Sequence, residues 1–296
     1  MDSLGGVLCV DKPLGITSHD VVNRIRRLTG LRRVGHAGTL DPLATGVLLL
    51  ALGRSTRLIE YLVGADKVYE TAVRLGQNTT TYDAEGDVVA ERPFAHLTLP
   101  QIKDALKSFR GTIQQQPPLY SAIKQGGQPL YKLARQGVKN VKRPYRTVTI
   151  HELSLISWEP PFLTLRIACS SGTYIRSLGH DLGEALGCGG HLTALRRLAV
   201  GDFGVETAVP LDQLTPENIV DHLLSPDTAV RHLPRVDLPE TAAAAILQGK
   251  QIPRQTSTPD GEARTYGSDG QFLGIVIAEG TYWRARKMFP PILSLE

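Results

Sequence analysis

The chain has 296 residues, of which 42% are hydrophobic and 21% charged, and its formal net charge is +4. This composition is typical of a globular protein and excludes a disordered or collagen-like chain, and no apolar run approaches the roughly 18 residues of a membrane-spanning helix. The N-terminus lacks the pattern of a signal peptide, and three widely spaced cysteines argue for a reducing compartment. We therefore expect a cytoplasmic protein.

The first predicted elements are a short strand and an amphipathic helix. Residues 7–10 are all apolar and predict a buried strand. Thr17 or Ser18 can cap a helix over residues 19–28, in which apolar residues recur at helical spacing, and Gly30 is suited to end it.

A glycine-rich segment, residues 35–46, surrounds one carboxylate, Asp41. Gly35, Gly38 and Gly46 permit backbone angles that other residues resist. Pro42 disfavours the helical region for Asp41, and the apolar run that follows predicts a buried strand that anchors the loop. An aspartate presented in this way is either a nucleophile or base, or the cap of a turn. The segment alone leaves both interpretations open.

A basic stretch without acidic residues occupies the middle of the chain. Residues 67–75 alternate between apolar and polar and predict a strand, and residues 100–109 predict a short helix. Residues 111–151 then contain no Asp or Glu and interleave tyrosines with basic side chains, which is typical of a nucleic-acid-binding surface. The basic side chains that we expect to bind it include Lys124, Lys132, Arg135, Lys142, Arg143 and Arg146.

Paired strands and a second helix follow the basic stretch. Residues 148–156 and 163–169 predict the strands, and the helix begins near Thr173. Arg176 lies in its first turn, where it could pair with a carboxylate and lower the pKa of that group; a surface arginine is the alternative. Residues 191–203 are predicted to be extended and residues 210–233 to be helical.

The order of these elements predicts the fold class. Strands and helices are interspersed without regular βαβ alternation, which favours an α+β domain with a mixed sheet. Beyond Leu233 the sequence predicts a short helix over residues 240–248 and strands near 272–278 and 282–287. We therefore expect a large domain over residues 1–230 and a small β-rich domain over residues 231–296.

Motifs for common cofactors are absent from the sequence. The chain has no G-x-x-x-x-G-K-[ST], H-E-x-x-H or G-x-S-x-G motif. Cys188 and His191 lie close together but lack the paired spacing of a zinc site. We expect no metal ion and no small-molecule cofactor.

Six separated segments resemble, in order, one family of enzymes. They are residues 11–18 (DKPLGITS), the loop around Asp41, Tyr69 within Lys-x-Tyr, and residues 117–122 (PPLYSA), 171–176 (SGTYIR) and 191–197 (HLTALRR). The family is that of the bacterial tRNA pseudouridine-55 synthases (TruB), and the resemblance covers about residues 7–205. Residues 269–274 resemble, more loosely, part of the small RNA-binding PUA domain of this family.

The resemblance implies an enzyme that isomerises uridine-55 in the T loop of tRNA to pseudouridine. In this reaction the N1–C1′ bond of a uridine breaks, the uracil turns and a C5–C1′ bond forms, on a base flipped out of its stack. Asp41 is implied to be the catalytic carboxylate, which adds covalently either to the ribose or to the base ring. Arg176 is implied to keep Asp41 charged and oriented.

The resemblance also implies roles for other residues. Tyr69 would stack on the flipped uracil, and its hydroxyl is a candidate for removing the C5 proton. Tyr174 and Leu195 would shape the pocket and contact the base. His36 would contact the RNA in the space that the flipped base leaves, and Lys12 would order the N-terminal loop. Ordinary core packing is the alternative for Tyr69 and Leu195.

The same resemblance implies how the RNA is held. Residues 111–150, approximately, would form an RNA-gripping insertion that clamps the T stem-loop of tRNA, and residues 231–296 would form a PUA-like domain. We expect the protein to act as a monomer. Two alternatives are a subunit of a guide-RNA-dependent synthase, which shares the aspartate loop, and a non-catalytic tRNA-binding or RNA-folding protein. The second would not need Asp41, Tyr69 and Arg176 together.

Overall fold

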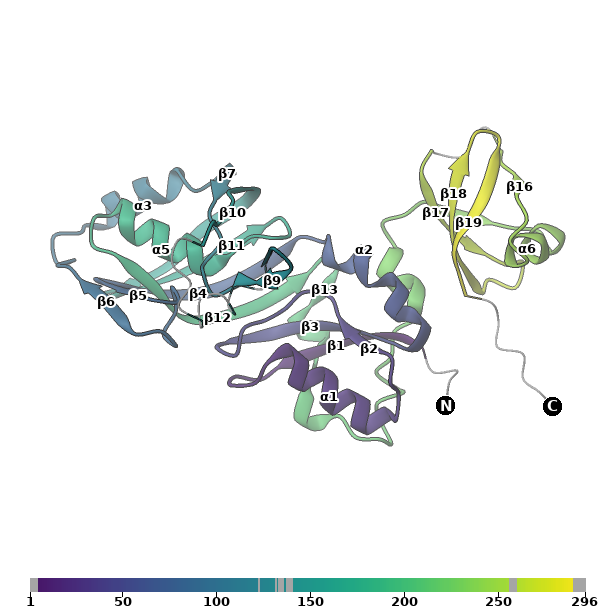
Figure 1. Ribbon diagram of the computed structural model, residues 1–296, viewed down its shortest axis with the longest axis horizontal. Helices are drawn as coiled ribbons and strands as arrows, with labels where there is room; N and C mark the ends of the chain where they lie inside the picture. Colours follow the sequence, from purple (N-terminus) through teal and green to yellow (C-terminus); the bar gives the residue numbers. More distant parts are fainter. Residues whose placement is uncertain are drawn as a thin grey trace.

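Two β-sheets organise the chain, and they lie at different ends of an elongated molecule (Figure 1). The computed structural model describes residues 5–121, 123–130, 132, 136, 141–255 and 260–289. Within these residues the larger sheet has ten strands and the smaller, C-terminal sheet has five. The larger sheet mixes parallel and antiparallel pairs. The predicted α+β class with a small β-rich C-terminal domain is confirmed.

The strands of the larger sheet come from the first 210 residues of the chain. Their bounds are β1 Gly6–Lys12, β2 Val34–His36, β3 Ala44–Leu52, β4 Lys67–Leu75, β7 Gly111–Gln115, β10 Arg146–Glu159, β11 Phe162–Cys169, β12 Gly190–Val200, β13 Phe203–Gly204 and β14 Val209–Pro210. The strands of two small hairpin sheets are β5 Gln77–Thr79, β6 Val88–Glu91, β8 Lys124–Gln125 and β9 Gln128–Pro129.

The remaining elements are the C-terminal strands and the helices. The C-terminal strands are β15 Arg235–Asp237, β16 Ile252–Pro253, β17 Glu262–Tyr266, β18 Phe272–Glu279 and β19 Tyr282–Met288. The α-helices that the structure describes are α1 Ser18–Thr29, α2 Ile59–Val63, α3 Leu99–Lys107, α5 Ile175–Ala185 and α6 Glu240–Leu247.

Strand β3 lies inside the larger sheet, whose order is β14-β1-β3-β12-β4-β11-β10-β7. It pairs antiparallel with β1 and parallel with β12. Leu48 and Leu50 pack in one apolar cluster with α1, whereas Val47 and Leu49 pack in another with Leu62 of α2. Because both faces of β3 are covered, its sequence is a continuous apolar run. The loop that precedes β3, which carries Asp41, therefore ends in a rigid strand.

Two elements confirm the local predictions closely. Helix α1 is capped by Thr17, whose hydroxyl accepts a hydrogen bond from the backbone N–H of Asp20, and it ends at Gly30 with φ of 69°. The left-handed backbone at the end of the helix favours glycine. Strand β4 alternates as predicted, with Tyr69 and Val73 on its buried face. Both patterns are local, so the sequence was sufficient to predict them.

The predicted helix over residues 210–233 is wrong. The structure has short 3₁₀ turns there instead, Leu211–Gln213 and Pro226–Val230. Leu211 packs in the cluster beneath α1, whereas Val230 packs in the cluster on the opposite face of the sheet. The segment therefore covers both faces, which a single helical stripe cannot do, and Pro226 lacks the N–H that a continuous helix requires.

The basic stretch begins and ends inside the larger sheet. Strand β7 pairs with the first part of β10, from Gly111 opposite Ile150 to Gln115 opposite Arg146. Residues 111–115 and 146–150, at the two ends of the expected RNA-gripping insertion, therefore belong to the larger sheet. Arg135 lies outside the described residues.

The C-terminal domain contacts the first domain beside α2. Arg57 Nη1 donates a hydrogen bond to the carbonyl of Met288 (2.8 Å), and Lys287 Nζ donates to the carbonyl of Arg57 (2.5 Å) and pairs with Glu60. Phe289 lies under the Arg57 guanidinium. Among the described residues, no helix is long and apolar enough to cross a membrane.

Candidate active site

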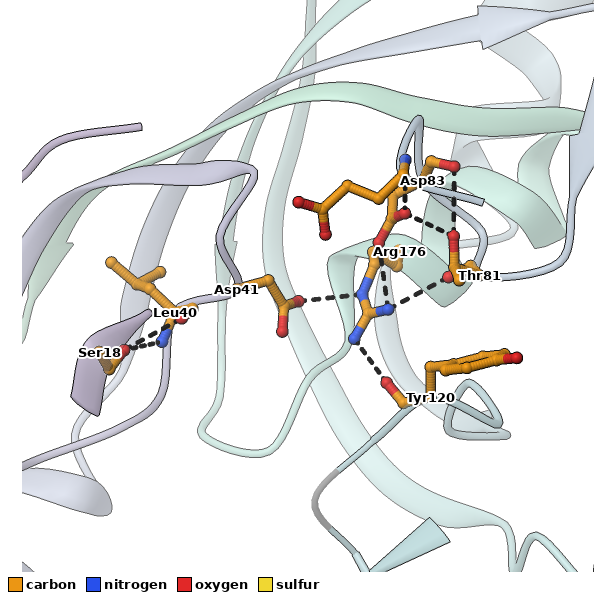
Figure 2. Close-up of polar contacts among 8 residues, drawn as sticks. Ser18, Leu40, Asp41, Thr81, Asp83, Tyr120 and Arg176 are labelled. Carbon is orange, nitrogen blue, oxygen red and sulfur yellow. Dashed lines mark hydrogen bonds and ion pairs between the residues drawn. The ribbon is translucent and has the colours of Figure 1, made fainter. Parts of the chain in front are cut away.

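The loop between β2 and β3 presents Asp41 and is held from two sides. Ser18 Oγ, at the start of α1, donates to the carbonyl of Leu40 (3.0 Å) and accepts from its N–H (2.8 Å). The N–H of Gly15 donates to the carbonyl of Pro42 (2.9 Å). Both neighbours of Asp41 are thus fixed by hydrogen bonds. Figure 2 shows its carboxylate pointing away from α1 and toward Arg176.

Arg176, in the first turn of α5, is bound by acceptors on every side. Its Nε is 3.0 Å from Asp41 Oδ2, and its Nη1 is 3.1 Å from Asp83 Oδ2. Nη1 also donates to the carbonyl of Thr81 (3.2 Å), and Nη2 donates to the carbonyl of Tyr120 (2.9 Å) (Figure 2). The side chain is 8% exposed. A buried guanidinium with this many partners has one orientation, so it fixes the carboxylate of Asp41 as well.

Asp83 is a site residue that the sequence did not reveal. It occurs in the segment Asp-Ala-Glu-Gly-Asp, which predicts only a turn. Its side chain is 2% exposed and accepts hydrogen bonds from Thr81 Oγ1 (2.5 Å) and the N–H of Glu85 (3.0 Å), in addition to its ion pair with Arg176. No local signal distinguishes this buried aspartate from an exposed turn residue.

A cleft of about 770 Å³ opens above Asp41 and Arg176. Tyr69 from β4, Tyr174 from the start of α5 and Leu195 from β12 also line it. Five of the predicted site residues are therefore brought into one cleft from four separate parts of the chain: Asp41, Tyr69, Tyr174, Arg176 and Leu195. Tyr69 is both 8% exposed and part of the cleft wall, so core packing and a role in the site are not exclusive for it.

Tyr174 is held in the cleft wall by an amide from the neighbouring strand. Gln115, the last residue of β7, donates from Nε2 to the carbonyl of Tyr174 (2.9 Å). Its Oε1 accepts from the N–H of Tyr174 (2.8 Å). Because this pair lies just before the first turn of α5, Gln115 also helps to place Arg176.

Lys12 and His36 lie outside the residues that line the cleft. Lys12 is fully buried, and its Nζ donates to the carbonyls of Pro13 (2.9 Å) and Ile16 (2.7 Å), which holds the N-terminal turn. Burial lowers the pKa of Lys12 to about 8, and the nearby Asp41 opposes this shift. His36 is half-buried, and burial lowers its pKa too.

The charge balance around Arg176 affects the protonation of Asp41. Burial in the cleft wall raises the pKa of the Asp41 carboxyl above its ordinary value, although 37% of its side chain is exposed. Arg176 and Lys12 lower this pKa, whereas Asp83 raises it. Arg176 thus lowers the pKa of Asp41, as predicted, but it does not decide the net direction of the shift. The net direction is upward, because burial outweighs the effect of Arg176, and the repulsion by Asp83 adds to it.

The predicted nucleic-acid-binding side chains differ in exposure. Lys132, Lys142 and Arg146 are exposed. Arg143 is half-buried, and its Nη1 donates to the hydroxyl of Tyr82 (3.2 Å) and to the carbonyl of Pro117 (3.3 Å). Arg143 therefore contacts the loop between β5 and β6, which carries Tyr82. Lys124 lies on β8.

Three family descriptions match successive parts of the chain. Residues 26–175 match the family described as "TruB family pseudouridylate synthase (N terminal domain)". Residues 176–232 match the "tRNA pseudouridylate synthase B C-terminal domain", and residues 234–280 match "Pseudouridine synthase II TruB, C-terminal".

Relatives cover nearly the whole chain. A tRNA pseudouridine synthase B of Azoarcus sp. is 46% identical over 273 residues, which are 91% of this chain and 90% of that protein. A second, of Haemophilus influenzae, is 43% identical over 96% of this chain and 94% of its own.

Solved structures share the fold. A chain of a Cbf5-Nop10-Gar1 complex is 29% identical with a TM-score of 0.73, over 97% of this chain and 85% of that one. A chain of an H/ACA RNP bound to a substrate RNA that contains 2′-deoxyuridine is 26% identical with a TM-score of 0.72, over the same shares. With a family match over more than half of its length and relatives above 40% identity along most of it, this chain belongs to the TruB family of pseudouridylate synthases.

Proposed function

We propose that this protein isomerises uridine-55 in the T loop of tRNA to pseudouridine, with Asp41 as its catalytic carboxylate. The observation that carries the proposal is the ion pair of Asp41 and Arg176 at the base of a cleft that Tyr69, Tyr174 and Leu195 also line. The relatives are named tRNA pseudouridine synthase B, which gives the substrate class. Those names favour this reading over a guide-RNA-dependent subunit.

The chemistry is a rearrangement within one nucleotide. The N1–C1′ bond breaks, C5 bonds to C1′, and the proton on C5 is removed while N1 gains one. Nothing is oxidised or reduced. An ionised carboxylate can assist by adding to C1′ or to the base ring and leaving again in a later step. Arg176 orients Asp41 for this addition and stabilises its charged form.

The cleft suits a base that has been taken out of its stack. Tyr69 and Tyr174 offer aromatic surfaces from opposite elements, β4 and the start of α5, and Leu195 adds an apolar contact. Enzymes that act on a base commonly read it between such side chains after flipping it. Tyr69 is the side chain we assign to stacking and to handling the C5 proton, and His36 the one we assign to the RNA beside the vacated space.

The RNA grip is assigned to two parts of the chain outside the cleft. The stretch of residues 111–150 carries the exposed Lys132, Lys142 and Arg146 and no acidic residue. We assign residues 1–230 to the catalytic domain and residues 231–296 to a PUA-like RNA-binding domain. The unit of function that we propose is a monomer.

A T-arm hairpin transcript tests the function directly. The purified protein is incubated with the hairpin, and pseudouridine is mapped by carbodiimide labelling and primer extension. We expect one modified uridine, at the position that corresponds to residue 55 of tRNA. Tight binding of the hairpin without any modification would instead support a non-catalytic tRNA-binding or RNA-folding protein.

The raised pKa of Asp41 predicts a loss of activity in acid. The ionised carboxylate is the reactive form, so kcat/KM should fall as the pH decreases through the pKa of Asp41, at a midpoint above the ordinary value of 3.8. Stability moves the other way for this group, because a raised folded-state pKa disfavours folding as the carboxyl ionises. The measurement is a pH–rate profile with circular dichroism at each pH. A rate that stays constant down to the ordinary value in folded protein would contradict the shift.

Charge reversal at Lys142 predicts weaker and less salt-sensitive RNA binding. Lys142 is exposed on the acid-free segment, and each lost phosphate contact reduces the slope of log Kd against log salt by about one. We expect this change for Lys142→Glu in filter-binding titrations at several salt concentrations. Lys103→Glu, at an exposed position on α3, is the matched control and should keep the slope of the wild type. Equal slopes for the two variants would argue against an RNA grip at Lys142.

A further inference from the structure

One row of residues crosses four neighbouring strands beside the cleft. Lys12 of β1 is paired with Gly46 of β3, Gly46 with Arg197 of β12, and Arg197 with Tyr69 of β4. Gly46 has φ of 97°, and a Cβ there would lie 2.2 Å from the carbonyl oxygen of Arg197. The absence of a side chain at Gly46 thus allows β12 to approach β3 closely. As a result Arg197 lies between the strand that follows the Asp41 loop and the strand that carries Tyr69.

The Arg197 side chain is buried and is hydrogen-bonded to β3 and to the Asp41 loop. The residue is 1% exposed. Its Nε donates to the carbonyl of Val47 (2.7 Å), and its Nη2 donates to the carbonyl of Gly38 (3.2 Å), within the Asp41 loop. Across the antiparallel pairing of β12 and β4, Arg197 lies directly opposite Tyr69, so the two side chains are neighbours on one face of the sheet. The hydrogen-bond partners of the guanidinium among the described residues are therefore two neutral carbonyls.

This arrangement differs from that of the adjacent arginine. Successive residues of a strand face opposite sides of the sheet. Arg196 accordingly turns away from Tyr69 and pairs with both carboxylate oxygens of Asp11 (3.2 and 2.6 Å), with 41% of its side chain exposed. Burying a guanidinium without a carboxylate partner is costly. A purely structural need would be met more cheaply by an apolar residue at position 197.

We propose that Arg197 is a positioning residue for the isomerisation, which sets the distance between the Asp41 loop and the Tyr69 hydroxyl. The proposal rests on the proposed function. It adds to the site a residue that we assign neither to contact with the base nor to the ion pair with Asp41. The Arg197 side chain holds Gly38 on the Asp41 loop, and its backbone pairs with Tyr69 on β4. Loss of the guanidinium frees the Asp41 loop to move relative to the strand that carries Tyr69.

An electrostatic consequence supports the geometry. Burial raises the pKa of the Tyr69 hydroxyl, and the positive charge of Arg197 opposes this shift. Arg197 therefore polarises the hydroxyl that we assign to the C5 proton. The hydroxyl and the Asp41 loop respond to one side chain.

The test compares three variants, Arg197→Gln, Arg197→Lys and Arg196→Gln. Arg197→Gln removes the charge and the planar fork, Arg197→Lys keeps the charge, and Arg196→Gln is the matched control on the same strand. The single-turnover rate and the Kd for a T-arm hairpin are measured for each. A 3-fluorotyrosine label, with the Tyr69 resonance assigned from Tyr69→Phe, reports the environment of the hydroxyl in RNA-free protein.

We expect Arg197→Gln to lower the single-turnover rate about 100-fold, the effect of misplacing a reacting group by about 1 Å, and to shift the fluorine resonance of Tyr69. The Kd of Arg197→Gln should stay within about threefold of the wild type. For Arg196→Gln, both the single-turnover rate and the Kd should stay within this range. Arg197→Lys should recover part of the rate.

Other outcomes overturn the proposal. A rate for Arg197→Gln equal to that of Arg196→Gln would do so, as would an unmoved Tyr69 resonance. If neither Arg197 variant folds, the residue serves the stability of the core and the positioning role is rejected. If the wild type itself forms no pseudouridine, the proposed function fails, and the fluorine measurement still decides whether Arg197 controls the Tyr69 hydroxyl.

Discussion

Replacing Asp41 with asparagine is expected to reduce the single-turnover rate of pseudouridine formation by more than about 10⁴-fold, as for other enzymes that lose their nucleophile. The amide of Asn has nearly the shape of the carboxylate, and its oxygen can still accept the hydrogen bond from Arg176 Nε, which is 3.0 Å from Asp41 Oδ2 in the wild type. The amide cannot add to the nucleotide, however. The fold and the cleft should therefore persist while the reaction stops.

Binding and a control variant separate this effect from misfolding. The Kd of Asp41→Asn for a T-arm hairpin should stay within about tenfold of the wild type, which is about 1.4 kcal/mol in binding free energy. The expected change is small because the Asp41 side chain carries no positive charge that would bind phosphate. Asp104→Asn, at a side chain that is 78% exposed on α3, should retain full activity. Product formed by Asp41→Asn at the rate of Asp104→Asn would remove Asp41 from the mechanism.

Replacing Asp83 with asparagine is expected to destabilise the protein by about 3–5 kcal/mol, the cost of leaving one partner of a buried ion pair unpaired. Asp83 and Arg176 are 2% and 8% exposed, so solvent does not replace the lost charge. The remaining carboxylate, Asp41, is 37% exposed and contacts a different nitrogen of the guanidinium. Denaturation with urea, followed by circular dichroism, measures the change in the free energy of unfolding.

The same variant should also lose catalytic rate. Without Asp83, Arg176 keeps its bonds to the carbonyls of Thr81 and Tyr120 but loses the charge that anchors Nη1. The orientation of Arg176, and hence that of Asp41, is then less restricted.

Asp104→Asn again serves as the control, since its ion pair with Lys107 is exposed and worth about 1 kcal/mol or less. A similar loss of stability in both variants would show that the Asp83 pair contributes no more than a surface pair.

Local patterns in the sequence were enough for many elements. The cap at Thr17 and the stop at Gly30 delimit α1 because their hydrogen bonds and backbone angles involve only nearby residues. Alternation placed Tyr69 on the inner face of β4 for the same reason. The helix predicted over residues 210–233 failed because its apolar residues cover two faces of a sheet, which no local period records.

The site was only partly predictable. The spacing of residues around Asp41 was compatible with both a nucleophile and a turn cap. The pairing of Asp41 with Arg176, which is far away in the chain, was predicted from the family resemblance. Neither route indicated Asp83, because an aspartate in a turn is usually exposed and its burial depends on α5 packing against that turn. Nor could the sequence indicate which arginine of the pair Arg196 and Arg197 faces inward.

The sequence by itself thus determined many of the elements, the cap and stop of α1, the buried face of β4 and the family that the chain resembles. The tertiary structure decided which charges meet. It placed Asp83 against Arg176, raised the pKa of Asp41, and set Arg197 between the Asp41 loop and Tyr69. The reason is physical: capping and periodicity act over a few residues, whereas ion pairing and burial depend on strands and loops that only folding brings within about 4 Å of one another.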